Sequence, residues 1–144
     1  MMLLCLFMAR PLKICLKDRM TRYISLEEIL RIHFQLMEDY GGSHGVRDEN
    51  CLNSAVKAPK QIVFGQEQYK TVFDKAAVYL RNLIGDHPFT DGNKRTAVTV
   101  CGIFLARNNA PLLAEPNKLE EFTLKIATKH LSIEEIALWI KSNT

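Results

Sequence analysis

Apolar residues recur at helical spacing along most of the chain, and this pattern predicts a succession of helices. The first begins at the capping box Ser25-Leu26-Glu27-Glu28 and ends at Gly41-Gly42. A second, short helix spans about residues 49–57, between an aspartate that can cap it and a proline that ends it. The segment 60–70 has a glycine and a short apolar run between polar flanks, so we expect a loop that holds a small extended piece.

Two strongly apolar segments predict the centre of the fold. One helix runs from Thr71 to Gly85, and the other begins near Asn93 and ends at Asn108-Asn109. Further capping boxes at Asn117-Lys118-Leu119-Glu120 and Ser132-Ile133-Glu134-Glu135 predict two C-terminal helices. Because no strands alternate with these helices, the pattern favours an all-α fold, a compact single-domain bundle with a polar loop between its two core helices.

The length of 144 residues suits one domain. Residues 1–19 precede a further methionine, Met20, and the first helix signal, so we expect an N-terminal extension followed by a domain that spans residues 20–144. Residues 1–8 are almost wholly apolar, but they are too few to cross a bilayer and lack the basic region that opens a signal peptide. We therefore expect no membrane association.

Charge and cysteine usage narrow the class of protein further. The 19 Lys and Arg against 16 Asp and Glu give a formal charge of only +3 without a basic run, so electrostatics predict no direct nucleic-acid partner. The cysteines, at positions 5, 15, 51 and 101, form neither a CxxC pair nor a zinc-like cluster with histidine. They indicate reduced packing thiols, which suits a cytoplasmic location.

One polar cluster between the two core helices is not explained by packing. His87, Asp91, Asn93, Lys94 and Arg95 fall within nine residues. A helix N-terminus offers unpaired N–H groups and the positive end of the helix dipole, so the segment that begins at the neighbouring Gly92 predicts a phosphate cradle. Two consecutive cations in a first helical turn oppose that dipole unless a polyanion binds there.

The other members of the cluster suit transfer of a phosphate-containing group. Asp91 offers a hard oxygen ligand, and Mg²⁺ typically uses one or two carboxylates together with substrate phosphates. His87 could accept the proton of an attacking hydroxyl, because an imidazole titrates near neutral pH. Each residue taken alone also fits a plain structural role as a cap or a surface charge. Together they favour a base, a metal ligand and an anion hole in one loop.

The stretch HPFTDGNKR, residues 87–95, resembles the Fic motif, commonly written HxFx(D/E)GNxRxxR, in the variant found in Doc-like toxins. The segments 23–28, 45–48 and 52–56 also resemble the opening of Doc-like proteins, so the resemblance covers about residues 20–144. It implies an all-helical Fic/Doc domain with Mg²⁺ and ATP as its cofactors.

The resemblance also implies a role for each residue of the loop. His87 would be the base on the target hydroxyl, and Asp91 would hold Mg²⁺. Asn93 and the loop amides from Gly92 onward would form the anion hole, while Lys94 and Arg95 would contact nucleotide phosphates.

Two departures from the adenylyl-transferring members bear on the reaction. Lys94 replaces a small residue that leaves room for phosphates, and Val98 occupies the position of the second motif arginine. Doc-like toxins share both features and are similar to kinases, so the resemblance implies transfer of the ATP γ-phosphate to a hydroxyl of elongation factor Tu, which arrests translation. An adenylyltransferase and a non-catalytic nucleotide- or peptide-binding module remain the alternatives.

The resemblance further implies two protein contacts. The chain lacks the inhibitory pattern [S/T]xxxE[G/N] of self-inhibited Fic proteins, which implies a separate Phd-like antitoxin as partner. The stretch Ile62-Val63-Phe64 lies where Fic proteins have a flap that aligns a target peptide by strand addition. For the segment as a whole we favour the flap, and for Phe64 itself we favour a buried anchor.

Overall fold

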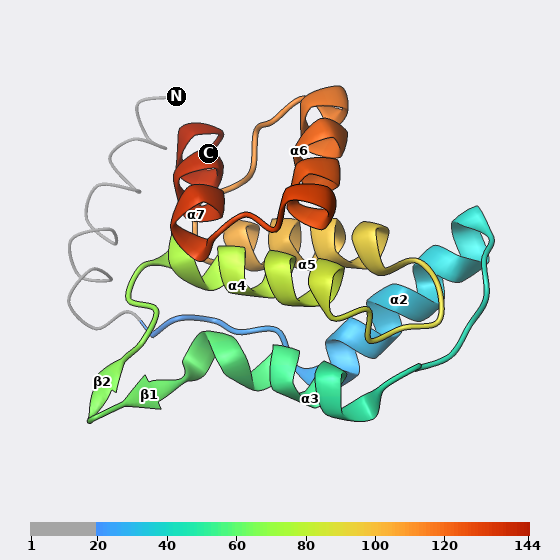
Figure 1. Ribbon diagram of the computed structural model, residues 1–144, viewed down its shortest axis with the longest axis horizontal. Coiled ribbons are helices and arrows are strands. Elements are labelled where there is room, and N and C mark those ends of the chain that lie inside the picture. The colour runs from blue at the N-terminus through green and yellow to red at the C-terminus, as the bar shows by residue number, and fades with distance from the viewer. Residues whose placement is uncertain (1–19) are drawn as a thin grey trace, which may run out of the picture.

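The computed structural model describes residues 20–144, and the predicted extension 1–19, with Cys5 and Cys15, lies outside them. Two adjacent helices form the centre, α4 (Val72–Gly85) and α5 (Asn93–Arg107), joined by the polar loop (Figure 1). On one side of this pair lie α2 (Leu26–Tyr40) and α3 (Glu49–Lys57). On the other side lie the two C-terminal helices, α6 (Pro116–Lys129) and α7 (Ile133–Ser142) (Figure 1). The prediction of an all-α bundle with the loop between its core helices is confirmed.

Local sequence signals set most of the helix ends. Ser25 and Ser132 form the predicted capping boxes of α2 and α7. A capping box that we did not recognise opens α4, because Asp74 instead of Glu or Gln reaches back to Thr71. The capping box predicted for α6 is wrong. That helix starts at Pro116, whose fixed φ and missing N–H suit the first helical position, so it begins earlier than predicted.

Helix α4 is buried on most of its faces because it packs between the two outer layers. All five residues from Ala76 to Leu80 are buried. Burial raises the pKa of Tyr79 to about 12, and the hydroxyl accepts a hydrogen bond from the Ile24 amide (3.0 Å). Burial likewise raises the pKa of Cys101, on α5, to about 12, which agrees with the prediction of a packing thiol. Within residues 20–144, no helix combines the length and the apolar character that crossing a bilayer requires.

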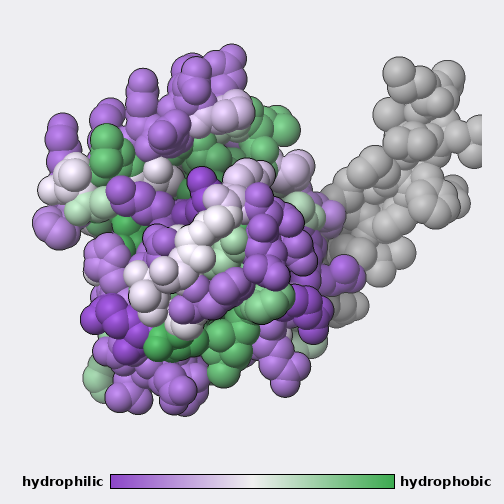
Figure 2. Space-filling view, turned by 90° about the vertical axis from the view of Figure 1, so that its right-hand side faces the viewer, coloured by the Kyte–Doolittle hydropathy of each residue, from purple (hydrophilic) through white to green (hydrophobic). Residues whose placement is uncertain are grey.

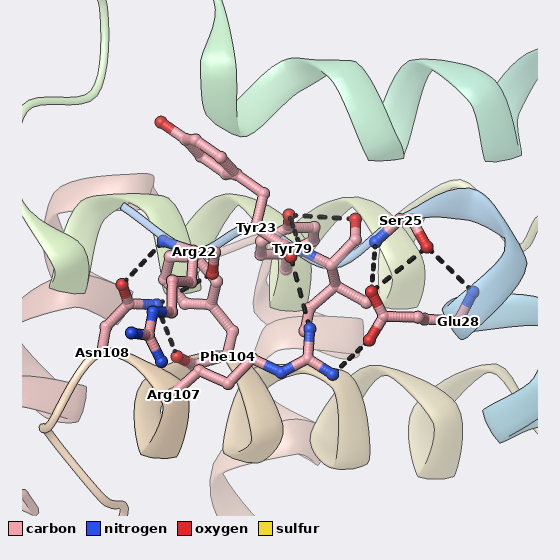
Figure 3. A network of polar contacts seen from close by, with 9 residues as sticks. Arg22, Tyr23, Ser25, Glu28, Tyr79, Phe104, Arg107 and Asn108 are labelled. Carbon is pink, nitrogen blue, oxygen red and sulfur yellow. Dashed lines mark hydrogen bonds and ion pairs between the residues drawn. The ribbon is translucent and has the colours of Figure 1, made fainter. Parts of the chain in front are cut away.

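A polar network ties the start of α2 to the end of α5 (Figure 3). Arg107 pairs with Glu28 and also donates to the Tyr23 carbonyl. Asn108 accepts a hydrogen bond from the Arg22 amide (2.9 Å) and donates to the Arg22 carbonyl (3.0 Å), so it closes a ring with that backbone. The network therefore fixes where α2 enters the fold.

A short hairpin precedes α4. Its strands are β1 (Ile62–Val63) and β2 (Gln66–Glu67), which follow the 3-10 turn η1 (Ala58–Lys60). Phe64 and Gly65 form the tip with φ of 52° and 75°, as a tight two-residue hairpin turn requires. The Phe64 side chain is 100% exposed, so its interpretation as a buried anchor is wrong. The turn directs the ring away from the bundle.

A buried lysine attaches this hairpin to the core. Lys75 on α4 is only 1% exposed, which is rare for a lysine without partners. Its ammonium donates to the Tyr69 carbonyl and lies 3.5 Å from a carboxylate oxygen of Glu67 in β2. The cation thus replaces its lost hydration with contacts to the hairpin and the segment after it.

Because of the ion pair between Glu28 and Arg107, we expect the stability of the fold to depend on pH. The hydrogen bond from Arg107 lowers the pKa of Glu28 to about 2, below the ordinary glutamate value of about 4.3. A depressed folded-state pKa stabilises the fold above the unfolded-state pKa, and this stabilisation is lost as the pH falls from about 4.3 toward 2. We expect Glu28→Gln, which can keep the capping box, to lower the free energy of unfolding at pH 7 but to match the parent near pH 2.

Urea unfolding of both proteins across this pH range measures the effect. Equal differences at pH 7 and pH 2 would contradict the assignment to the ion pair.

Candidate active site

The loop between α4 and α5 is anchored by an aromatic side chain. Phe89 is 1% exposed, and its ring stacks on the His33 ring of α2 with centroids 3.8 Å apart and planes 5° from parallel. Pro88 before it is also buried. The interior of the loop is therefore part of the core, while its polar residues face outward.

The segment between α2 and α3 pairs with this loop along the backbone. Val46 and Phe89 form an antiparallel bridge, and the Thr90 amide donates to the Gly45 carbonyl (3.0 Å). The Arg47 and Asp48 amides both donate to the Pro88 carbonyl, at 2.8 and 3.1 Å. Segment 45–48, which the sequence marked only by its resemblance to Doc-like proteins, therefore shapes the loop directly.

Two side chains close the loop from within. Asn93 accepts from the Phe89 amide (2.9 Å) and donates to the Phe89 carbonyl (3.0 Å). The predicted anion-hole residue thus uses both ends of its amide to hold the loop, with one N–H left over. His33 donates from Nε2 to the Asp91 carbonyl (2.8 Å). Burial lowers the pKa of His33, which favours the neutral ring.

Sequence analysis assigned no role to His33. Its burial follows the helical period, since Ile29 and Met37 lie one turn away on either side and are buried as well. That spacing was a usable signal for a buried histidine, but nothing local indicated which loop it contacts.

The Asp91 carboxylate is held in place by backbone amides. One oxygen accepts from the Gly92 amide (2.8 Å) and the other from the Ser43 amide (3.2 Å). A Cβ at Gly42 would lie 2.7 Å from the second oxygen, so this approach requires glycine. Within residues 20–144 no group of three or more His, Cys, Asp or Glu side chains converges on a possible metal position. A single carboxylate such as that of Asp91 fits an ion that takes most of its ligands from phosphates and water, as Mg²⁺ does.

The first turn of α5 leaves its amides available. Its N-cap is Gly92, in a left-handed conformation (φ 75°) and without any side chain to cap the helix. A Cβ there would collide with the Met37 side chain, so the backbone and α2 approach closely. Lys94 and Arg95 are exposed in the same turn, and the Arg95 guanidinium lies 4.4 Å over the Tyr40 ring. Unpaired amides plus two cations suit an anionic ligand.

A cavity of about 720 Å³ brings these groups together. Its lining includes all six predicted loop residues, namely His87, Asp91, Gly92, Asn93, Lys94 and Arg95. Helix α6 supplies a second wall through Pro116, Leu119, Glu120 and Thr123. Sequence analysis missed this wall, because amphipathic spacing alone does not reveal which loop a helix faces. Figure 2 shows the side of the molecule that carries the loop, where hydrophilic residues prevail.

His87 occupies an unusual backbone position at the mouth of this cavity. Its side chain is exposed, and its φ of 47° lies in the left-handed region, which costs a residue other than glycine roughly 1–2 kcal/mol. Such strain persists only where surrounding contacts enforce it.

The predicted flap is not brought to this cavity. Ile62, Val63 and Phe64 are absent from its lining and lie beyond the opposite end of α4 from the loop (Figure 1). Docking of a target by these residues stays a prediction.

The fold and the cavity define a helical protein with a polar loop at the uncapped N-terminus of a core helix. Residues 23–105 match the family model described as the Fic/DOC family. The chain is 34% identical over 120 residues to "Toxin Doc" of Mycolicibacterium smegmatis, covering 82% of this chain and 90% of that protein. It is 32% identical over 116 residues to "Protein kinase doc" of Escherichia phage P1, covering 81% and 90%. The chain therefore belongs to the Fic/DOC family, as a Doc-like member.

Truncation of the anchoring ring tests the packing of the loop. We expect Phe89→Ala to lower the free energy of unfolding by about 3–5 kcal/mol, because it removes a fully buried aromatic side chain. Phe34→Ala is the matched control, since that ring is 55% exposed, and we expect a loss of about 0.5 kcal/mol or less. Urea unfolding measures both values, and equal losses would contradict the role of Phe89 as the anchor.

Proposed function

We propose that this protein is the toxin of a toxin-antitoxin pair and a kinase that transfers the γ-phosphate of Mg-ATP to a hydroxyl group of a protein target. The observation that carries the proposal is the cavity in which His87, Asp91 and the uncapped N-terminus of α5 meet. The similarity to a protein named a toxin and to one named a protein kinase supports it.

In this proposal the loop residues divide the reaction among them. His87 accepts the proton of the target hydroxyl, whose oxygen forms a bond to the γ-phosphorus. The bond from that phosphorus to the oxygen bridging to the β-phosphate breaks, and ADP leaves. Asp91 holds Mg²⁺, which neutralises phosphate charge when bound. The amides that follow Gly92 in the first turn of α5, with Lys94, stabilise the negative charge on the transferring group.

Two residues favour phosphoryl over adenylyl transfer. Lys94 places a long cationic side chain at the mouth of the amide cradle, where adenylyl-transferring relatives have a small residue. Val98, one turn further along α5, lines the cavity with an apolar surface in the position of their second arginine. The nucleotide phosphates thus meet a different distribution of charge from that in adenylyl-transferring relatives. Adenylyl transfer is the second candidate function.

The target and the partner of this proposal follow from the resemblance to Doc-like toxins. The target is elongation factor Tu, whose modification arrests translation in the cytoplasm. The antitoxin is Phd-like and is a separate chain.

Labelled ATP distinguishes the candidate reactions. We expect purified protein with Mg²⁺ and γ-labelled ATP to label elongation factor Tu, in isolation and in a cell extract. Label carried over from α-labelled ATP instead would indicate adenylyl transfer, and label from neither would favour a non-catalytic binding module.

The same assay tests the base. We expect His87→Asn to reduce labelling by roughly 10²–10⁴-fold, the usual contribution of a general base. Asparagine tolerates the left-handed backbone at this position, so the fold should keep its thermal midpoint. The matched control is His130→Asn, since His130 has a similar φ of 51° at the end of α6. Full activity of His87→Asn would refute the assignment.

Coexpression tests the pairing with an antitoxin. We expect expression of this chain alone to stop growth, and coexpression with the small open reading frame next to its gene to restore growth. Toxicity that persists during coexpression would refute that pairing. The control for toxicity is a strain that expresses the His87→Asn variant alone, which should grow.

A further inference from the structure

We propose that Arg47 is a positioning residue that holds His87 in its reactive orientation, an inference that rests on the proposed role of His87 as the base. Arg47 lies on the segment between α2 and α3, 40 residues from His87 in sequence. Its guanidinium donates from Nε to the His87 carbonyl (2.6 Å) and from Nη2 to the Asp86 carbonyl (2.7 Å).

The backbone of the same segment continues this contact. The amides of Arg47 and Asp48 donate to the Pro88 carbonyl, so three consecutive carbonyls, from residues 86 to 88, are bound by one short segment. These bonds fix the peptide planes on both sides of His87. Fixing both planes sets its φ and ψ, and thereby the direction in which the imidazole leaves the backbone.

The conformation that these bonds hold is one that the chain does not prefer. His87 has a φ of 47°, in the left-handed region that disfavours residues with a Cβ. In the absence of the guanidinium, His87 gains access to the extended conformation that a residue before proline favours. The imidazole would then spend less time facing the cavity.

An arginine suits this task better than a lysine does. The planar fork presents two N–H groups at fixed spacing, which matches two neighbouring carbonyls, whereas an ammonium is a point donor on a flexible stem. The carbonyls also lie at the C-terminal end of α4, where the helix dipole favours a cation.

Arg47 acts on the reaction through His87 and not through the nucleotide. The cavity lining within residues 20–144 includes His87 but not Arg47. The guanidinium donates to the carbonyls of Asp86 and His87. Its removal should therefore slow the chemical step and leave nucleotide binding unchanged.

Steady-state kinetics with Mg-ATP and the protein target test this inference. We expect Arg47→Ala to lower kcat by roughly 10- to 100-fold, as small misplacements of a catalytic group do, with KM for ATP within about twofold of the parent. Arg47→Lys should give an intermediate kcat. The matched control is Arg31→Ala, which removes an exposed arginine of α2, and it should keep the parental kcat.

Amide hydrogen exchange supplies a readout that does not depend on activity. We expect the amides of Phe89 and Thr90 to exchange faster in Arg47→Ala than in Arg31→Ala, while the thermal midpoints of the two variants agree. A purely structural role would lower the thermal midpoint along with kcat.

Three results would overturn the inference. The first is a kcat and a KM that both match the parent. The second is a rise in KM for ATP at constant kcat, which would indicate a direct nucleotide contact. The third is a loss of activity matched by a loss of thermal stability. If the parent protein transfers neither phosphate nor AMP, the proposed function fails. Exchange then tests only the hold of Arg47 on the His87 backbone: faster exchange in Arg47→Ala supports that hold, and unchanged exchange overturns it.

Discussion

The candidate site depends on one constraint, the docking of the loop between α4 and α5 onto the two segments that precede it in sequence. Burial of the Phe89 ring against His33 fixes the loop from inside, and backbone pairing with residues 45–48 fixes it from outside. Neither contact is catalytic. Without them the polar residues would lie on an unconstrained connection between helices, because the loop has no regular structure of its own.

Helix α2 supports the polar residues of the loop that line the cavity. The Met37 side chain packs against Gly92, where a Cβ would collide with its terminal methyl group, and the Asp91 carbonyl accepts a hydrogen bond from the buried His33. The Asp91 carboxylate and the first amides of α5 are thereby turned toward the cavity. The orientation of these groups is thus a product of core packing, which changes less on ligand binding than a mobile loop does.

Much of the fold could be predicted because its signals are local. A capping residue, a helix period and a terminating glycine all act within a few positions, as at Ser25 and Gly41. The start of α6 was misplaced because Pro116 competes with a capping box that lies inside the same turn. The motif also identified the loop residues that line the cavity, with the exception of Thr90.

The supporting contacts could not be predicted, because they join distant parts of the chain. His33 meets Asp91 across 58 positions and Arg47 meets His87 across 40, so no periodicity relates either pair. The exposure of Phe64 was missed for another reason. A large apolar residue normally favours burial, but here the geometry of a two-residue turn decides where the ring points.

The hairpin and the candidate site lie at opposite ends of α4 (Figure 1). The hairpin is attached through Lys75 near the first turn of α4, whereas the loop follows the last turn, and a helix of fourteen residues is about 21 Å long. Substitutions at the hairpin tip can therefore accumulate without disturbing the geometry around His87. Such a layout lets the surface of the hairpin change while the geometry of the loop stays constant.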